Sequence, residues 1–362
     1  MNKTKKISFV YTLPTSFVTK DIENLKSIGH QVFEITSPPF KNFFLFFNNR
    51  IREFFKGFFL IPKSNCVIIW FSDYHGLIPL VIAKIFSIKS IVIVGGYDAI
   101  SDKEIDHGIF SKNNLRQKIA RMNFNLATNI WVVDETLSKG CKKAFIQNNI
   151  NSGLINWMPN LEKKIKVVPT GYSSTFWKKT KLKLPNTVLT VANFNDSRVL
   201  KLKGIPIILK LAKELPEFNF IILGLKTQSI ISADIKPPNV ETIKSKNKME
   251  LREYFSENQF YIQASRLEGL PNALCEAMLC ECIPIGNAVF GIPKVIGNTG
   301  LLFNGEKDFK RIKKFLRGKN QKSGTHARQQ IINFFDKEKR IEELKKIWHE
   351  HKTERVFVLS RI

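Results

Sequence analysis

The chain has 362 residues, of which 43% are hydrophobic and 24% are charged, and these proportions exclude an intrinsically disordered or fibrous protein. Its length exceeds that of a typical single hydrophobic core, which predicts two domains. The net charge of +26 suits nucleic acid or an anionic membrane as a partner, and an AT-rich genome that favours lysine and asparagine is the alternative explanation.

Short runs rich in β-branched residues mark the first half of the chain. Helical patterns or loops separate them, which indicates βα units and a mostly parallel sheet. The first run is short and lacks a small-residue cleavage site, so a strand explains it better than a signal peptide. No uninterrupted apolar run reaches about 18 residues, so we expect no membrane-spanning helix. The runs are residues 7–10, 31–35, 67–70, 90–94, 130–133 and 165–168.

The segment from Phe40 to Ile61 departs from this alternation because its phenylalanines repeat with the spacing of one helix face. Lys41, Arg50, Arg52 and Lys56 add positive charge around that face. The combination favours a helix lying in a membrane interface, where each basic residue near an anionic leaflet contributes about 1 kcal/mol. A helix buried in the domain is the alternative. The apolar face would comprise Phe40, Phe43, Phe44, Phe47, Ile51, Phe54, Phe55 and Phe58.

The alternation of strands and helices restarts after a lysine-rich stretch at residues 178–185, which we interpret as a linker. A second series of runs follows, so the sequence predicts an α/β fold with two Rossmann-like domains that face an interdomain cleft. We expect these domains at residues 1–180 and 181–335, followed by a charged amphipathic helix within 336–362. The second series comprises residues 188–192, 220–223, 240–243, 260–263, 283–285 and 301–303.

Glu268 and Glu276 flank a Gly-x-Pro turn that opens a predicted helix. Backbone amides at such a turn lie beside the positive end of the helix dipole and suit an anion. Gly269 removes a side chain that would keep a ligand off the backbone, and Pro271 fits the first helical turn. Both carboxylates can accept hydrogen bonds from sugar hydroxyls. A ligand with a phosphate at the turn and a polyol at each carboxylate would be a nucleotide sugar. The alternative is an ordinary solvent-facing helix start with acidic residues.

The stretch from Ser265 to Met278 resembles the signature of family 4 glycosyltransferases, which have the GT-B fold. The resemblance implies a retaining, metal-independent transferase that uses a nucleotide diphosphate sugar and no cofactor. The absence of an Asp-x-Asp pair agrees with metal independence. The resemblance also implies that the last helix packs back on the first domain. Further similar segments are residues 29–32, 168–172, 203–204, 283–286 and 291–303.

Site residues follow from this resemblance. It implies that Glu268 contacts the transferred sugar, that Glu276 holds the ribose, and that Lys203 with Arg198 holds the diphosphate. Cations there would offset charge on the leaving group. Lys201 competes with Arg198, because the usual arginine position reads Asn193 here. The remaining donor contacts would be Gly269, Leu270, Pro271 and Asn272.

Two departures from the family pattern affect the first domain. The loop at residues 13–17 lacks the usual paired glycines, and residues 95–98 read Gly-Gly-Tyr-Asp where many relatives have a histidine. Asp98 at a strand's carboxyl end is a candidate polar contact facing the cleft. His75, just beyond another strand, is a candidate acceptor or sugar contact, and a hydrogen-bonded structural histidine is the alternative.

The combined interpretation is a transferase acting on a membrane-associated glycan or lipid-linked acceptor in cell-surface polysaccharide biosynthesis. The scattered cysteines, odd in number, indicate a reducing cytoplasm, and the helix at 40–61 places the enzyme at the inner membrane face. No nucleic acid is expected as a partner. The alternatives are a basic nucleic-acid- or membrane-binding protein with a vestigial GT-B cleft, and a soluble sugar-phosphate glycosyltransferase. The base, the sugar and the acceptor stay undetermined.

Overall fold

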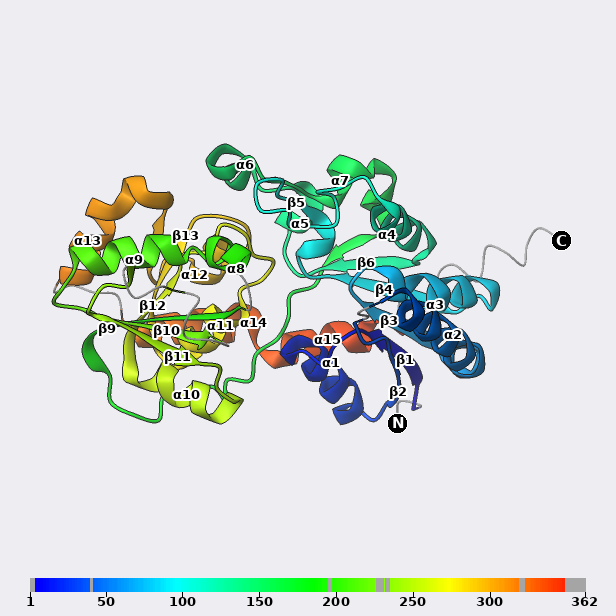
Figure 1. Cartoon of the computed structure of the whole chain (residues 1–362). Coiled ribbons are helices and arrows are strands. Elements are labelled where there is room, and N and C mark those ends of the chain that lie inside the picture. The colour runs from blue at the N-terminus through cyan, green and yellow to red at the C-terminus, as the bar shows by residue number, and fades with distance from the viewer. Residues whose placement is uncertain are drawn as a thin grey trace.

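The computed structural model describes residues 4–39, 42–194, 197–225, 231, 235–318 and 323–348. These residues form two α/β domains that lie side by side and are joined by an extended segment (Figure 1). Each domain is built around a six-stranded sheet in which every neighbouring pair of strands is parallel. The predicted fold class is therefore confirmed.

The N-terminal sheet has the order β2-β1-β3-β4-β6-β8, so its strand order reverses between β1 and β3. β3 and β4 are buried along their whole length, as expected for central parallel strands covered by helices on both faces. The strands are Lys6–Tyr11 (β1), Gln31–Thr36 (β2), Cys66–Trp70 (β3), Lys89–Val94 (β4), Asn129–Val132 (β6) and Ile165–Val167 (β8).

The C-terminal sheet has the order β11-β10-β9-β12-β13-β14, which reverses between β9 and β12. This is the strand order of a doubly wound dinucleotide-binding fold, in which ligands bind at the reversal. Each predicted run in both halves of the chain corresponds to a strand. The strands are Leu184–Phe194 (β9), Asn219–Leu225 (β10), Val240–Lys244 (β11), Asn258–Gln263 (β12), Ile283–Asn287 (β13) and Leu301–Phe303 (β14).

Helices connect the strands and cover the sheets. The N-terminal domain has Ser16–Ser27 (α1), Phe43–Leu60 (α2), Tyr74–Ile85 (α3), Leu115–Leu126 (α4), Thr136–Lys139 (α5), Lys142–Asn148 (α6) and Leu154–Trp157 (α7). The rest of the chain has Ser197–Leu202 (α8), Ile205–Glu214 (α9), Lys248–Glu257 (α10), Asn272–Leu279 (α11), Ile292–Ile296 (α12), Phe309–Arg317 (α13), Gly324–Phe335 (α14) and Lys337–Lys346 (α15). A small antiparallel pair, Ile100–Ser101 (β5) with Asn151–Ser152 (β7), was not predicted.

The chain passes between the domains twice, and the two passages are bonded to each other. Tyr172 on the first passage donates its amide to the Phe335 carbonyl at 2.9 Å, and the Lys337 amide donates to the Tyr172 carbonyl at 3.0 Å. A Cβ atom on Gly171 would lie 2.8 Å from the Cα atom of Lys337, so only glycine permits this approach. The two passages therefore form one narrow ribbon.

The last helix, α15, packs on α1 of the N-terminal domain (Figure 1). Its Arg340 side chain is 1% exposed and forms a bidentate ion pair with Asp21, with Nε–Oδ1 and Nη2–Oδ2 distances of 2.9 and 2.6 Å. Arg340 Nη1 also donates to the Val168 carbonyl, and Trp70 Nε1 donates to Asp21 Oδ2. This fully bonded pair fixes the end of the described chain to the first domain.

Helix α2 packs with its polar side facing the domain. Only Glu53 and Gly57 are buried, and a Cβ atom on Gly57 would lie 3.0 Å from Ile82 Cδ1 on α3. The predicted apolar face is exposed, which excludes a helix buried in the domain; Phe40 lies outside the described residues. The other predicted members, Phe43, Phe44, Phe47, Ile51, Phe54, Phe55 and Phe58, are all exposed, and so are Leu45 and Phe59 of the same helix.

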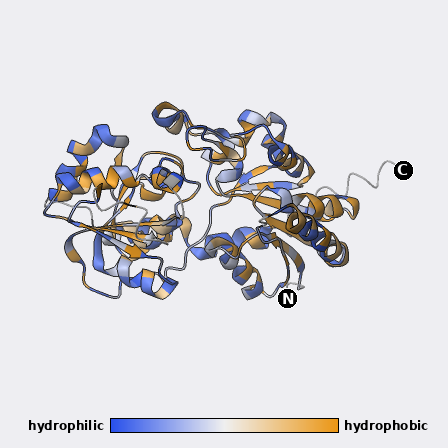
Figure 2. Cartoon of the chain, in the orientation of Figure 1, coloured by the Kyte–Doolittle hydropathy of each residue, from blue (hydrophilic) through white to orange (hydrophobic). Residues whose placement is uncertain are grey.

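The exposed apolar surface continues from α2 onto α3 through Val81, Ile85 and Phe86, and the Phe58 and Phe86 rings lie 6.3 Å apart. Figure 2 shows hydrophobic residues along both helices, at the edge of the molecule away from the C-terminal domain. Arg50, predicted to flank this surface, instead turns toward the domain and pairs with Glu53. Among the described residues, no helix has the length and hydropathy needed to cross a bilayer.

We predict that Asp21→Asn destabilises the protein by about 3–5 kcal/mol, because it leaves the buried Arg340 charge without its partner. Urea unfolding followed by circular dichroism measures the difference. Glu135→Gln removes a carboxylate from an exposed pair with Lys139 and serves as the control, with little expected change. Equal stability of both variants would show that the Asp21–Arg340 pair does not hold α15 in place.

Candidate active site

Loops that follow β9 and β12 meet where the strand order of the C-terminal sheet reverses. Lys203 lies between α8 and α9, and Glu268 lies in the loop after β12. The Lys203 Nζ atom is 2.5 Å from Glu268 Oε1, which also accepts hydrogen bonds from Gln263 and Ser265 at 2.9 Å. The structure thus brings a cation and a carboxylate together at the place where this fold binds ligands.

Gly204 explains why Lys203 reaches that carboxylate. Its backbone is left-handed, with φ at 68°, and an added Cβ atom would lie 2.0 Å from the Ala264 carbonyl oxygen. Only glycine allows the start of α9 to approach the end of β12 so closely. The Arg266 amide donates to the Leu202 carbonyl at 3.0 Å and fastens the two loops further.

Glu276 on α11 is 6% exposed and pairs with a residue of the other domain. Its Oε1 atom lies 2.8 Å from Lys20 Nζ of α1, and that ammonium also lies 4.5 Å from the centre of the Tyr172 ring. Glu268 and Glu276 therefore have separate cationic partners, one from each domain. A ribose at Glu276 would have to replace Lys20.

The turn between the two glutamates touches the N-terminal domain. A Cβ atom on Gly269 would lie 1.9 Å from the Gly95 carbonyl oxygen, so glycine is required at position 269 by a neighbouring backbone. Leu270 is buried, Pro271 immediately precedes α11, and Asn272 accepts a hydrogen bond from the Tyr172 hydroxyl at 2.8 Å. A diphosphate at this turn would require the domains to separate there.

His107 belongs to the candidate site although the sequence interpretation did not include it. Its ring packs edge-on against Tyr97 at 5.0 Å, and it lies in the loop that follows β5. Burial, followed by the nearby Lys203 ammonium, lowers the pKa of His107 to about 4. The imidazole is therefore neutral near pH 7 and can donate or accept a hydrogen bond near Glu268.

Arg198 and Lys201, the two candidates for a second phosphate-binding cation, point to different places. Arg198 is exposed on α8 and lines a cavity of about 380 Å³ together with Tyr97, His107 and Arg116. Lys201 lies 3.6 Å from Glu104 of the other domain. Of the two, only Arg198 shares a cavity with His107, so the geometry favours Arg198 for a role beside Lys203.

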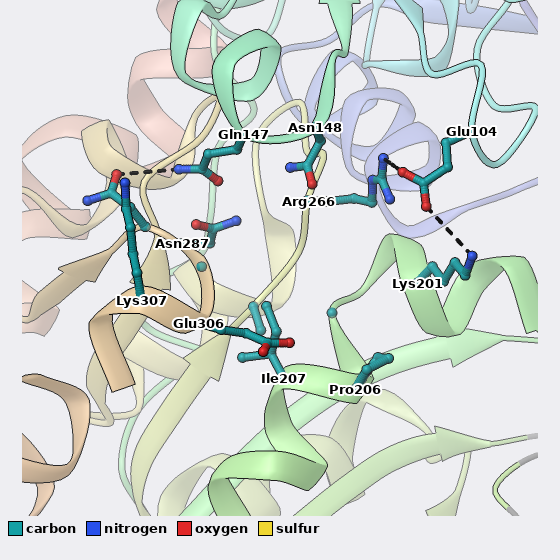
Figure 3. A pocket seen from close by; sticks show the side chains of 14 residues that line it. Glu104, Gln147, Asn148, Lys201, Pro206, Ile207, Arg266, Asn287, Glu306 and Lys307 are labelled. Carbon is teal, nitrogen blue, oxygen red and sulfur yellow. Dashed lines mark hydrogen bonds and ion pairs between the residues drawn. The ribbon is translucent and has the colours of Figure 1, made fainter. Parts of the chain in front are cut away.

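A larger pocket of about 590 Å³ lies between the domains next to this site (Figure 3). Figure 3 shows Glu104 between Arg266 and Lys201, with Gln147 across the pocket. Arg266 also lies 2.9 Å from Asp102, and Gln147 donates to Asn304 at 3.4 Å. These contacts join the domains around a space lined by amide and charged groups, which suit a polyhydroxylated compound.

The two predicted contacts from the N-terminal domain are buried. Asp98 is fully buried and accepts hydrogen bonds from the amides of Ser72, Gly95 and Gly96, so it does not face the cleft; burial raises its pKa to about 6. His75 is 2% exposed and donates from Nε2 to the Trp70 carbonyl at 2.7 Å, and burial lowers its pKa. A cavity of about 390 Å³ includes His75 in its wall.

Within the part of the chain that the structure describes, no group of three or more histidine, cysteine, aspartate or glutamate residues is arranged to hold a metal ion. Cations near the candidate site include the side chains of Lys203, Arg198 and Lys20.

Comparison with known proteins relates this arrangement to an enzyme family. Residues 175–332 match the family model described as Glycosyl transferases group 1, which spans the second domain and α14. No curated protein matches the sequence significantly. The matched segment contains Lys203, Glu268 and Glu276.

Solved structures match over nearly the whole chain. Sucrose-phosphate synthase from Thermosynechococcus elongatus has a TM-score of 0.70 at 13% identity, covering 96% of this chain and 98% of its own. HepE from Anabaena, solved with UDP and glucose, has a TM-score of 0.66 at 14% identity, with 96% and 100% covered. The catalytic domain of starch synthase IV from Arabidopsis thaliana, bound to ADP and acarbose, scores 0.66 at 10% identity, with 96% and 99% covered. The shared fold is GT-B.

We predict that His107→Gln reduces the loss of stability on acidification. In the unfolded chain the His107 imidazole takes up a proton near pH 6.5, whereas in the folded chain it does so only near pH 4. Folding stability contributed by neutral His107 is therefore present above pH 6.5 and is lost as the pH falls toward 4. Between pH 7 and pH 5, the wild-type free energy of unfolding should fall by up to about 2 kcal/mol more than that of the variant. Urea titrations at both pH values measure this; parallel losses would place His107 in solvent.

Proposed function

We propose that this chain is a group 1 glycosyltransferase that transfers a sugar from a nucleotide diphosphate donor to a lipid-linked or membrane-associated glycan; the match of residues 175–332 and the GT-B fold support this. The observation that carries the proposal is the Lys203–Glu268 pair, which lies at the reversal of a dinucleotide-type sheet and beside the start of α11. HepE, of the same fold, was solved with UDP-glucose, which supports a nucleotide sugar as donor.

The donor diphosphate would lie between Lys203 and the amides at the start of α11, where the helix dipole and a cation both favour negative charge. Arg198 is the candidate for a second phosphate contact. Glu268, held by Gln263 and Ser265, would then accept hydrogen bonds from hydroxyls of the transferred sugar, and Glu276 from the ribose. Binding requires the Lys20–Glu276 contact to open.

The chemistry that fits this arrangement is front-face displacement with retention of configuration. The acceptor hydroxyl oxygen forms a bond to the anomeric carbon, while the bond from that carbon to the diphosphate oxygen breaks. The leaving phosphate oxygen accepts the acceptor's proton, and Lys203 stabilises the charge that develops on the diphosphate. Closure of the domains around the reactants excludes water and limits hydrolysis of the donor.

The membrane part of the proposal rests on α2. The helix turns Glu53 and Gly57 toward the domain and exposes its phenylalanines, so the domain does not shield its apolar face from water. Exposed Arg52 and Lys56 on the same helix, and the net charge of +26, complement an anionic lipid surface. We propose that the enzyme binds the inner membrane face and acts from the cytoplasm in cell-surface polysaccharide biosynthesis.

The two alternative functions account for less of the structure. A nucleic-acid-binding protein would interleave basic and stacking aromatic residues on one face, whereas here the exposed phenylalanines gather on one helix. A transferase with a soluble sugar-phosphate acceptor leaves the exposed face of α2 without a function. Nucleotide and membrane binding decide between these functions.

We predict that UDP binds with a Kd at least tenfold weaker in Glu276→Gln than in the wild type, because the neutral amide is a poorer acceptor for ribose hydroxyls. Isothermal titration calorimetry measures the affinities, with ADP and GDP as alternative bases. Glu281→Gln is the matched control, since Glu281 follows the same helix but pairs with Lys179. Equal affinities, or stabilisation by oligonucleotides and not by nucleotides, would favour the nucleic-acid-binding alternative.

We predict that Phe54→Ser with Phe58→Ser weakens binding to vesicles containing phosphatidylglycerol by at least tenfold, because two apolar anchors are lost from α2. Co-sedimentation measures the bound fraction. Phe145→Ser with Phe334→Ser is the control, since these exposed phenylalanines lie on α6 and α14. If both pairs of substitutions reduce binding equally, α2 is not the membrane anchor.

A further inference from the structure

The cavity of about 390 Å³ whose wall includes His75 lies in the N-terminal domain, where the strand order of the N-terminal sheet reverses. Thr12 after β1, Ser37 after β2 and Asp73 after β3 contribute to its wall, so it occupies the crevice at the carboxyl ends of parallel strands. Arg50 of α2 and Arg116 of α4 complete the wall. The donor site described above uses the reversal in the other domain, so this crevice has no assigned ligand.

Arg50 is the unusual residue of this cavity. Its Nη2 atom donates to Ser37 Oγ and to Glu53 Oε1, each at 2.5 Å, and its guanidinium lies 5.2 Å from the centre of the Phe46 ring. Its Nε and Nη1 atoms are buried and have no hydrogen-bond partner. Buried charged donors without partners are rare, because their desolvation is not compensated, and an anion would supply the acceptors that these two atoms lack.

The surroundings of Arg50 favour an anion. The first turn of α3 lines the cavity through Tyr74 and His75, at the positive end of the helix dipole, where the Asp73 carboxylate already accepts a hydrogen bond from the Tyr74 amide. Each carboxylate nearby has a guanidinium partner: Asp73 pairs with Arg116, and Glu53 pairs with Arg50 through Oε1, while Glu53 Oε2 is buried without a hydrogen-bond partner. Burial also raises the pKa of Glu53 to about 7, which reduces its negative charge. No unpaired carboxylate therefore opposes an anion among the described residues of this wall.

The position of the cavity connects two parts of the proposed function. On one side Arg50 belongs to α2, whose opposite face exposes phenylalanines to solvent. On the other side Arg116 lines both this cavity and the one that contains His107 and Arg198. An anionic group at Arg50 would thus have an apolar surface on one side and the donor site on the other.

We propose that Arg50 binds the phosphate of a lipid-phosphate-linked sugar acceptor. The lipid chain lies along the exposed face of α2, and the acceptor sugar extends past Arg116 toward Glu268. This inference rests on the proposed transfer to a lipid-linked acceptor and names the chemical group by which that acceptor is recognised.

Binding of farnesyl phosphate, a short lipid phosphate, tests the proposal. Removing Arg50 alone would leave Glu53 buried without a partner, so the comparison uses Glu53→Gln against Arg50→Gln/Glu53→Gln. We expect Glu53→Gln to bind farnesyl phosphate with at least tenfold higher affinity than the double variant in calorimetric titrations. Both should bind farnesol, which lacks the phosphate, equally weakly. Arg311→Gln, which removes an exposed arginine from α13 in the other domain, should retain wild-type affinity.

If Glu53→Gln and Arg50→Gln/Glu53→Gln bind farnesyl phosphate with equal affinity, the assignment of Arg50 is overturned. Inorganic phosphate that binds as tightly as farnesyl phosphate would overturn the lipid source and leave a phosphate site. Circular dichroism confirms that both variants are folded. Titration of the same samples with UDP separates this test from the proposed function. A failure to bind UDP would count against the donor site, whereas binding of the lipid phosphate needs no donor.

Discussion

In a parallel sheet, the ligand-binding loops lie at the carboxyl ends of the strands. The arrangement of this molecule depends on two such sets of loops, one from each domain, facing each other. The contact between them is made by backbone: Gly95 and Gly269 approach so closely that a side chain on Gly269 would collide with the Gly95 carbonyl. Charged pairs surround that contact, with Arg266 reaching Asp102 and Lys20 reaching Glu276. The candidate site is therefore assembled from both domains, although the family match lies in one of them.

Helix α2 reverses the usual relation between polarity and burial. A surface helix ordinarily buries its apolar stripe and exposes its charges. Here Glu53 and Gly57 face α3 and the sheet, while the phenylalanines remain in water in the isolated protein. Polar contacts such as Arg50 with Ser37 orient the helix without consuming its apolar face. In the proposed function, this division lets one helix serve both a lipid surface and a ligand cavity.

Local sequence signals were sufficient for the strands and for the central pair of the site. The strands are continuous β-branched runs between turn residues, and the Lys203–Gly204 and Glu268–Glu276 motifs depend on geometry within a few residues. Lys20 and His107 could not be predicted, because their places near Glu276 and Lys203 depend on how distant segments pack. The same reason applies to Asp98, whose carboxylate is used by three backbone amides, and to the inward turn of Arg50. β5 and β7 are too short to show a period.

The bonded ribbon formed by the two interdomain passages has a mechanical consequence. Backbone hydrogen bonds between Tyr172, Phe335 and Lys337 keep the passages in register, and Arg340 anchors the second one through its ion pair with Asp21. Two segments joined by backbone hydrogen bonds resist shearing and twisting more than a single flexible linker does. We therefore expect the domains to open by a pivot near Gly171 that returns Lys203 and Lys20 to the same alignment on closing.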